Sequence, residues 1–107
     1  MIGKVNSAGG IKRLVTAQAE NSAASGDVYV TLTCDFDPLV IFAYGTYYSV
    51  GKSEAKWRLT KDGSWTSSNT AHHTASGITL SGRTITAGPY RDNGSAGGYL
   101  FAFGFPD

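Results

Sequence analysis

The feature that most constrains the fold is a strict alternation of side chains between Val28 and Phe36. Apolar residues occupy every second position of this segment, and threonine, tyrosine or aspartate fills the positions between them. Successive side chains of a β-strand point to opposite faces, so a period of two predicts a strand with one buried face. Asp37 and Pro38 follow, and proline has no amide proton to donate to a ladder. We therefore expect this strand to end there.

Two further segments have strand character. Leu39 to Tyr44 (LVIFAY) is a continuous apolar run between a proline and a glycine. Such a run is typical of a strand that is covered on both faces, so we expect it at the centre of the core. Lys56 to Lys61 alternates instead, which places Trp57 and Leu59 on one face of a strand.

Turn residues predict two tight hairpins. Asp62-Gly63 lies between strand-like segments, and this dipeptide suits a type I′ turn because both central residues need positive φ. Ile78 to Ala87 (ITLSGRTITA) is nearly palindromic about Ser81-Gly82, which predicts a second hairpin. The closing segment, Tyr99 to Phe105, places its aromatic residues on one face and Leu100 and Ala102 on the other.

The first segment allows two interpretations. Ile11, Leu14 and Val15 would form a short helical stripe, but an isolated helix of about ten residues is marginal. We therefore predict a strand from Arg13 to Ala19. Polar, glycine-containing stretches separate the strands and are expected to be loops: Asn21 to Gly26, Gly45 to Ala55, Ser67 to Gly77 and Gly88 to Gly98.

About seven short strands without a convincing helix predict an all-β fold, a small antiparallel β-sandwich. The chain has 107 residues, which is the size of one domain. We expect residues 1–10 to form a flexible N-terminal arm and residues 11–107 to form a single β-sandwich domain.

Composition argues against several classes of function. The net charge is +1 and no basic run occurs, whereas nucleic-acid binding requires clustered cations. Cys34 is the only cysteine, which excludes an internal disulfide and a thiolate zinc site. No stretch approaches the ~20 apolar residues of a membrane span, and the N-terminus has no signal-peptide core. We therefore expect no nucleic-acid partner, no membrane insertion and no signal peptide.

Catalytic side chains are present but poorly arranged. Cys34, Asp35 and His72 would supply a nucleophile, an orienting group and a base. Cys34 falls at an inward position of its strand, where a free cysteine is normally inert. Asp62 and Asp92 are the only loop carboxylates that we would nominate for glycoside hydrolysis. We expect that the protein is not an enzyme and uses no cofactor.

Two groups of residues have metal-binding chemistry. His72 and His73 are adjacent, so both would reach one metal ion only from a loop. A solvated loop is favoured over a metal site or a pH-sensitive interface. Asp35 and Asp37 would supply oxygen ligands to calcium. The favoured interpretation of this pair is that it caps and solubilises a strand end.

Three segments together resemble a known family of proteins. They are Thr31 to Gly45 (TLTCDFDPLVIFAYG), Ser64 to Ser68 (SWTSS) and Gly98 to Gly104 (GYLFAFG). Their order is similar to that of the small β-sandwich modules of phage and prophage tail fibres, baseplates and minor structural proteins. The resemblance covers roughly Leu14 to Gly104.

This resemblance implies a structural protein of the bacteriophage virion that acts in assembly and host attachment. It implies a homo-oligomer, with a homotrimer favoured, and other virion proteins and a host-surface glycan as partners. The protein would be made in the host cytoplasm and localise to the virion. Two alternatives remain: a capsid decoration or head-fibre protein with a purely structural role, and a carbohydrate-binding module unrelated to phages.

Aromatic side chains outside the expected strands are the candidate binding residues. The chain has two Trp, six Tyr and five Phe, and such residues suit both subunit interfaces and stacking on the apolar face of a sugar. Trp57 and Trp65 are expected instead to pair across their hairpin as core. Asp62 and Asn69 would add hydrogen bonds. The ligand or interface candidates are Tyr47, Tyr48, Trp65, Tyr90, Arg91, Asp92 and Asn93.

Overall fold

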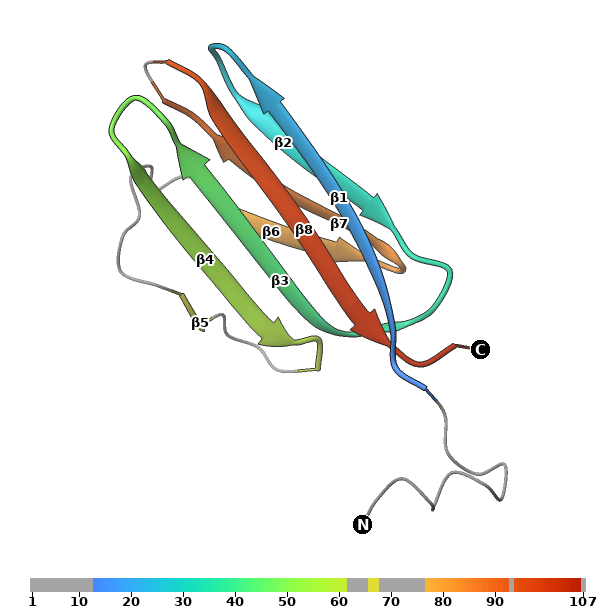
Figure 1. Ribbon diagram of the computed structural model, residues 1–107. Coiled ribbons are helices and arrows are strands. Elements are labelled where there is room, and N and C mark those ends of the chain that lie inside the picture. The colour runs from blue at the N-terminus through green and yellow to red at the C-terminus, as the bar shows by residue number, and fades with distance from the viewer. Residues whose placement is uncertain (1–12, 62–65, 68–76, 93, 107) are drawn as a thin grey trace, which may run out of the picture.

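A computed structural model of the chain describes residues 13–61, 66–67, 77–92 and 94–106. Two antiparallel β-sheets pack face to face, and none of these residues lies in a helix, which confirms the predicted all-β sandwich (Figure 1). The larger sheet has the order β1-β8-β3-β4-β5 and the smaller has the order β2-β7-β6. The described residues thus contain eight strands, of which β5 has two residues, where the sequence predicts about seven.

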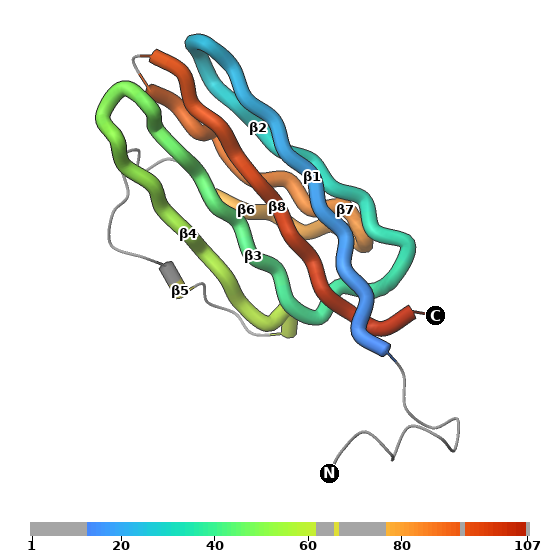
Figure 2. The backbone as a smooth tube through the Cα atoms, in the orientation of Figure 1, coloured from blue at the N-terminus to red at the C-terminus, as the bar shows by residue number. Residues whose placement is uncertain are grey.

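The strands of the larger sheet are β1 (Val15–Ala23), β8 (Ala96–Gly104), β3 (Pro38–Tyr47), β4 (Lys52–Leu59) and β5 (Thr66–Ser67). Those of the smaller sheet are β2 (Val28–Thr33), β7 (Thr84–Tyr90) and β6 (Gly77–Ser81). Figure 2 shows the chain passing from the larger sheet to the smaller between β1 and β2, and returning between β2 and β3. The first residue of β1 pairs with the last residue of β8.

The alternation that dominates the sequence governs the packing of β2. Its side chains alternate between buried and exposed, and the alternation continues past the end of the strand to Phe36. Cys34 faces inward as predicted, and its amide donates to the Arg83 carbonyl at 2.8 Å. The ladder of β2 ends at Thr33, and Pro38 becomes the first residue of β3.

One prediction about β3 is wrong. Ile41 and Ala43 are buried, but Leu39 is 41% exposed and Phe42 and Tyr44 are only half-buried. The apolar run is therefore fully covered on one face and not on both. The smaller sheet supplies that cover through β2 and β7, which pack on the inner faces of β1, β8 and β3. The buried core comprises Val28, Val30, Leu32, Cys34, Phe36, Ile41, Ala43, Tyr47, Ile85, Ala87, Tyr90, Ala96, Leu100 and Ala102.

Two glycines make room for the ring of Tyr90, one of the two tyrosines in this core. Gly45 of β3 and Gly98 of β8 are paired across the ladder. A Cβ atom on Gly45 would lie 2.5 Å from the Tyr90 ring, and one on Gly98 would lie 2.7 Å from that ring and from Val30. Such distances are shorter than van der Waals contact, so only glycine fits at either position. The pair forms a slot that holds the ring of Tyr90.

Three of the four expected loops are shorter than predicted or contain strand residues. The segment between β3 and β4 is a turn of residues 48–51, and the segment between β7 and β8 spans only residues 91–95. Strand β1 continues through Asn21 to Ala23, so the turn there is shorter as well. Long ladders with β8 hold these strand ends, because Tyr47 pairs with Ala96 and Ala23 pairs with the same residue from the other side. The loop predicted from Ser67 to Gly77 lies mostly outside the described residues.

The hairpin predicted near Ser81-Gly82 is confirmed. Strands β6 and β7 pair from Gly77 to Ser81, and Gly82 has φ of 61°, which favours glycine at the turn. The predicted Asp62-Gly63 turn lies outside the described residues, as does the N-terminal arm of residues 1–10.

Candidate binding face

The side of the larger sheet that points away from the smaller sheet carries aromatic and aliphatic side chains on three adjacent strands. These residues alternate along β8, β3 and β4 with residues that point inward. The registers of β3 with β8 and with β4 align them in rows across the sheet. We call this surface the aromatic face, and it consists of Val40, Phe42, Tyr44, Ala55, Trp57, Leu59, Tyr99, Phe101 and Phe103.

Ring contacts connect the three strands of the aromatic face. The ring of Phe42 stacks on Trp57 with centroids 6.1 Å apart and an interplanar angle of 26°. On its other side, Phe42 lies 6.1 Å from Phe101. In the next row, the rings of Tyr44 and Tyr99 form a tilted pair, with centroids 6.1 Å apart and an interplanar angle of 45°. Cross-strand aromatic pairs of this kind stabilise a sheet and hold the rings in fixed positions.

The aromatic face remains in contact with water. Trp57 is 36% exposed and Leu59 is 46% exposed, while the phenylalanine and tyrosine rings are half-buried against their neighbours. Three strands about 4.8 Å apart, with rows about 7 Å apart along each strand, give an apolar area on the order of 200–300 Å². The largest apolar patch on a typical monomer covers about 300–600 Å² and is often functional, and the aromatic face lies at the lower limit of that range.

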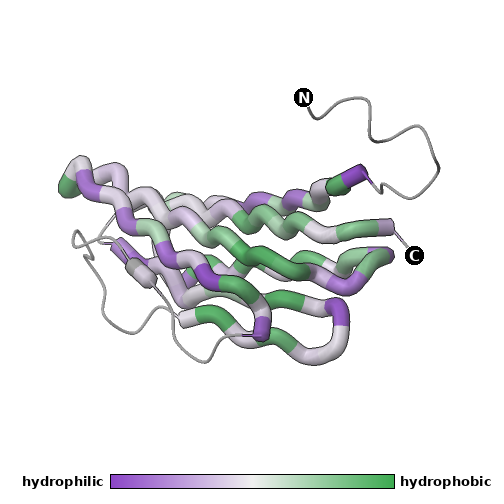
Figure 3. Tube along the Cα trace, turned by 90° about the horizontal axis from the view of Figure 1, so that it is seen from below, coloured by the Kyte–Doolittle hydropathy of each residue, from purple (hydrophilic) through white to green (hydrophobic). Residues whose placement is uncertain are grey.

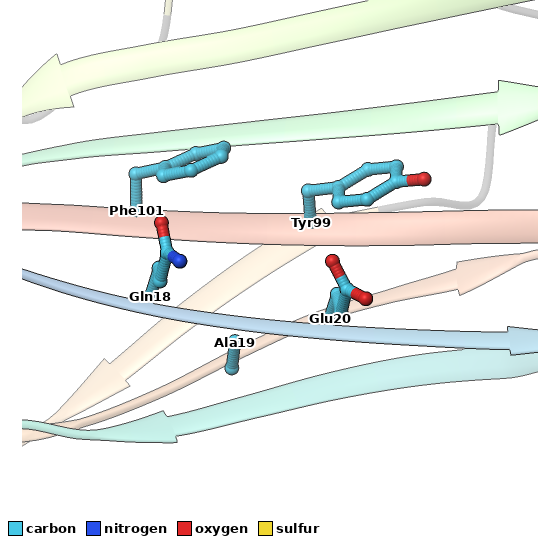
Figure 4. A pocket seen from close by; sticks show the side chains of 5 residues that line it. All are labelled: Gln18, Ala19, Glu20, Tyr99 and Phe101. Carbon is cyan, nitrogen blue, oxygen red and sulfur yellow. The ribbon is translucent and has the colours of Figure 1, made fainter.

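A shallow groove of about 270 Å³ lies beside the aromatic face, between β1 and β8. Figure 4 shows the side chains of Gln18 and Glu20 rising from β1 beside the rings of Tyr99 and Phe101 from β8. Ala19 contributes to the lining but its side chain points to the other side of the sheet. The register explains this arrangement, because Gln18 pairs with Phe101 and Glu20 pairs with Tyr99.

Tyr48 is the one described aromatic candidate from the sequence that reaches this surface. It is 54% exposed, and its phenol lies where a Cβ atom on Gly97 would be only 3.3 Å away. The neighbouring hydroxyl of Thr46 and then that of Tyr99 lower the pKa of Tyr48. The neighbouring phenol of Tyr48 in turn raises the pKa of Tyr99. Tyr48 thus extends the row of tyrosines toward the β3–β4 turn.

Strand β4 distributes its polar and apolar side chains between the two faces of the sheet in the opposite way to β3 and β8. Its inward positions carry charged residues, including Glu54, Lys56 and Arg58, while Trp57 points outward. Figure 3 shows these hydrophilic residues recurring along β4 next to the strongly hydrophobic stretch of β3. Glu54 is buried and accepts a hydrogen bond from the Tyr47 hydroxyl. This inversion places Trp57 in the same row as Phe42 and Phe101.

Several residues predicted to bind a ligand are structural. Tyr47 and Tyr90 are buried in the core and their rings contact each other, with centroids 6.3 Å apart. Burial and then the charge of Glu54 raise the pKa of Tyr90 to about 12. Asp92 is also buried, and its carboxylate accepts a hydrogen bond from the Ser49 amide at 2.9 Å. The sequence placed these three ligand or interface candidates in exposed loops, whereas the structure buries them: strand pairing draws Tyr47 and Tyr90 into the sandwich, and Asp92 lies in the turn after β7.

The remaining candidates are distributed elsewhere. Arg91 is exposed and forms an ion pair with Asp27, which ties the β7–β8 turn to the start of β2. Trp57 lies on the aromatic face, so its predicted role as core is wrong. Other candidates lie outside the described residues, namely Trp65, Asn93, His72, His73, Asp62 and Asn69.

The polar residues around β2 are held by other parts of the sandwich. Asp37 accepts a hydrogen bond from Arg83 at 2.8 Å, and this ion pair joins the β2–β3 connection to the β6–β7 turn. The side chain of Asp35 is exposed. The pKa of the neighbouring Cys34 thiol is raised, mainly because the thiol is buried. Among the described residues, no three histidine, cysteine or acidic side chains gather as a metal site.

Sequence reasoning missed Phe42 and Tyr44 as surface residues. The apolar run of β3 hid them, because a strand with one aromatic face and one aliphatic face has the same composition as a fully buried strand. The signal that would have found them lies in β4. There, Lys56 and Arg58 alternate with Trp57, which indicates that the two sides of this strand face different surroundings.

The chain was compared with protein-family models, with curated proteins and with solved structures, and no match was found in any of the three comparisons. The described residues also contain no helix that is long and apolar enough to cross a membrane.

Proposed function

We propose that this protein is a non-enzymatic attachment and assembly module of a phage-type virion, and that it acts through its aromatic face. The observation that supports the proposal is the row of Trp57, Phe42 and Phe101, three rings that are aligned across three strands and remain accessible to water. Apolar rings held on a rigid sheet lose little conformational entropy when a partner binds to them. A binding surface of this kind needs no catalytic group.

Attachment to a host-surface glycan is the first activity that we assign to this face. Aromatic rings can stack on the apolar side of a sugar ring. Polar groups that can bond to hydroxyls flank the rings, with Gln18 and Glu20 on one side and the phenol of Tyr48 at one end. An apolar surface with a few positioned polar groups is typical of small-molecule sites.

A purely structural role, as in a capsid decoration or a head fibre, is the second candidate. It is favoured by the aliphatic end of the same sheet, where Leu39, Leu59, Thr60 and Lys61 line a hollow of about 250 Å³. Leu39 and Leu59 are both more than 40% exposed, and association with a second copy or another virion protein would cover them. The proposed homotrimer belongs to this assembly role.

The test is a pair of substitutions read out in two ways. Trp57→Ala and Phe101→Ala should each weaken binding to host cell-wall material by tenfold or more if attachment is the function. Tyr29→Ala is the matched control, because Tyr29 is 50% exposed on the smaller sheet and should leave binding unchanged. If assembly is the function, the Trp57 variant should instead lower the mass of the oligomer in solution.

Two results would count against the proposal. If the variants of the aromatic face keep both the cell-wall binding and the oligomer mass of the wild type, the aromatic face is not the functional surface. The genes adjacent to the gene for this chain test the virion assignment separately, since a neighbourhood without phage structural genes would contradict it.

A further inference from the structure

We propose that the groove between β1 and β8 binds one uncharged pyranose unit of a glycan. This inference rests on the proposed attachment function and names the class of ligand for one part of the same face. The groove is lined by the side chains of Gln18, Glu20, Tyr99 and Phe101, and by Ala19.

The arrangement of these side chains pairs an aromatic ring with a polar group twice. Phe101 and Tyr99 are two residues apart on β8, so their rings lie on the same side of the sheet about 7 Å apart. Across the ladder, Gln18 lies opposite Phe101 and Glu20 lies opposite Tyr99. Figure 4 shows the carboxamide and the carboxylate beside the two rings. The groove therefore has a stacking wall on β8 and a hydrogen-bonding wall on β1.

A pyranose matches both walls. The C–H groups on one side of the sugar ring form an apolar surface that can pack on Tyr99 and Phe101. The hydroxyls at the rim of the sugar can donate to the Glu20 carboxylate, and the Gln18 carboxamide can both donate to and accept from them. Hydrogen bonds to a charged carboxylate are stronger than those between neutral groups.

The size of the groove limits the ligand to a small unit. Its volume of about 270 Å³ is below the range of about 300–1,000 Å³ that is typical of drug-sized ligands. The apolar area of the whole aromatic face, on the order of 200–300 Å², is also below the roughly 450 Å² of apolar surface that each partner of a stable protein complex buries. One sugar unit of a longer glycan fits both limits better than a folded protein does.

Charge decides which sugars fit. Glu20 is the charged side chain in the lining, and it is negative. A uronic acid, a sialic acid or a phosphorylated sugar would place a second negative charge beside it, and like charges at short distance repel. The groove should therefore accept neutral hexoses and N-acetylhexosamines and reject anionic sugars.

The experiment measures binding of the full chain to neutral and anionic oligosaccharides of the same length by ligand-observed NMR and on a glycan array. Wild-type protein should bind at least one neutral oligosaccharide, at millimolar affinity or better, and should bind anionic oligosaccharides at least tenfold more weakly. Tyr99→Ala should reduce neutral binding by tenfold or more. Glu20→Gln keeps an acceptor oxygen but removes the charge, so it should reduce neutral binding by less than fivefold and raise anionic binding.

Thr16→Ala is the control on the same strand, because Thr16 pairs with Phe103 outside the groove and should change neither affinity. Preference of the wild type for anionic sugars, or an unchanged preference in Glu20→Gln, would overturn the inference. Failure of the wild type to bind any neutral oligosaccharide would also overturn it. In that case, a loss of oligomer mass in Trp57→Ala would show that the aromatic face still acts in assembly, which separates this failure from failure of the proposed function.

Discussion

Strands β8 and β4 belong to the same sheet, yet they divide their polar and apolar residues in opposite ways. The inner side of β8 is apolar, with Leu100 and Ala102 fully buried, and its outer side carries Tyr99 and Phe101. The inner side of β4 carries charges such as Lys56, and its apolar residues point outward. Both strands nevertheless contribute rings to the same outer row.

The position of the smaller sheet accounts for this difference. Strands β2 and β7 contact β1, β8 and β3, while β4 contacts β3 and β5. A strand under the smaller sheet must present apolar residues to it, because an uncompensated buried charge is costly. Lys56 and Arg58 of β4 are half-buried on their inner side. The apolar outer row therefore extends across strands that the smaller sheet covers and across β4, which it covers less, and this row is available for binding.

The largest effect that distinguishes the two strands is expected from truncating an inner residue of β8. Leu100→Ala should lower the free energy of unfolding by about 2–5 kcal/mol, because the side chain is fully buried and a cavity would remain. Trp57→Ala on β4 removes more atoms but should cost less than half as much, because Trp57 is 36% exposed. Urea unfolding of both variants measures this, and equal losses would contradict the comparison.

A pH above 10 should lower the stability of the folded protein through Tyr90, which is buried between the two sheets. Burial raises its pKa from 10 in the unfolded chain to about 12 in the folded protein, so the folded state holds the proton more tightly. The resulting stability is complete below pH 10 and is lost as the pH rises toward 12. At about 1.4 kcal/mol for each unit, the loss is about 2 to 3 kcal/mol.

Tyr90→Phe removes this titration and should flatten the dependence of stability on pH between 10 and 12. Thermal unfolding at a series of pH values measures the slope for both proteins. Tyr48→Phe is the control, because Tyr48 is exposed on the aromatic face. An identical slope in the wild type and the Tyr90 variant would show that other groups cause the alkaline loss.

The smallest expected difference in stability is between alanine substitutions at two adjacent glycines of β8, Gly97 and Gly98, which face opposite sides of the sheet. Gly98→Ala would place a methyl group 2.7 Å from the Tyr90 ring and from Val30, and overpacking of this kind typically costs about 1–3 kcal/mol. Gly97→Ala faces outward, where the nearest atoms are the hydroxyls of Thr46 and Tyr48 at 3.3 Å, and Tyr48 can move. Melting temperatures should therefore fall further for Gly98→Ala, and the reverse order would contradict the proposed slot for Tyr90.

Much of the fold was predictable because periodicity is a local property. The alternation from Val28 to Phe36 predicted which side of β2 is buried, down to the inward position of Cys34. The repeat around Ser81-Gly82 predicted the β6–β7 hairpin. The alternation at the end of the chain separated Leu100 and Ala102 from the aromatic residues, but it did not indicate which set faces the core.

The candidate site was predictable only in part. Tyr48 was chosen correctly as a surface aromatic, whereas Tyr47 and Tyr90 were assigned to loops that are in fact the ends of paired strands. Their chemistry is the same as that of surface tyrosines, so composition has no means to separate the two cases. Only the long-range pairing of β3 with β8 and of β7 with β2 draws them inside.

By itself, the sequence determined the fold class, most of the strands and the two faces of each of them, because side-chain direction in a strand depends only on residue spacing. The tertiary structure decided which face is covered, since that depends on where the smaller sheet lies over the larger one. It also decided that Trp57, Phe42 and Phe101, from three separate segments, form one row, because register between distant strands is set by the packing of the whole sandwich.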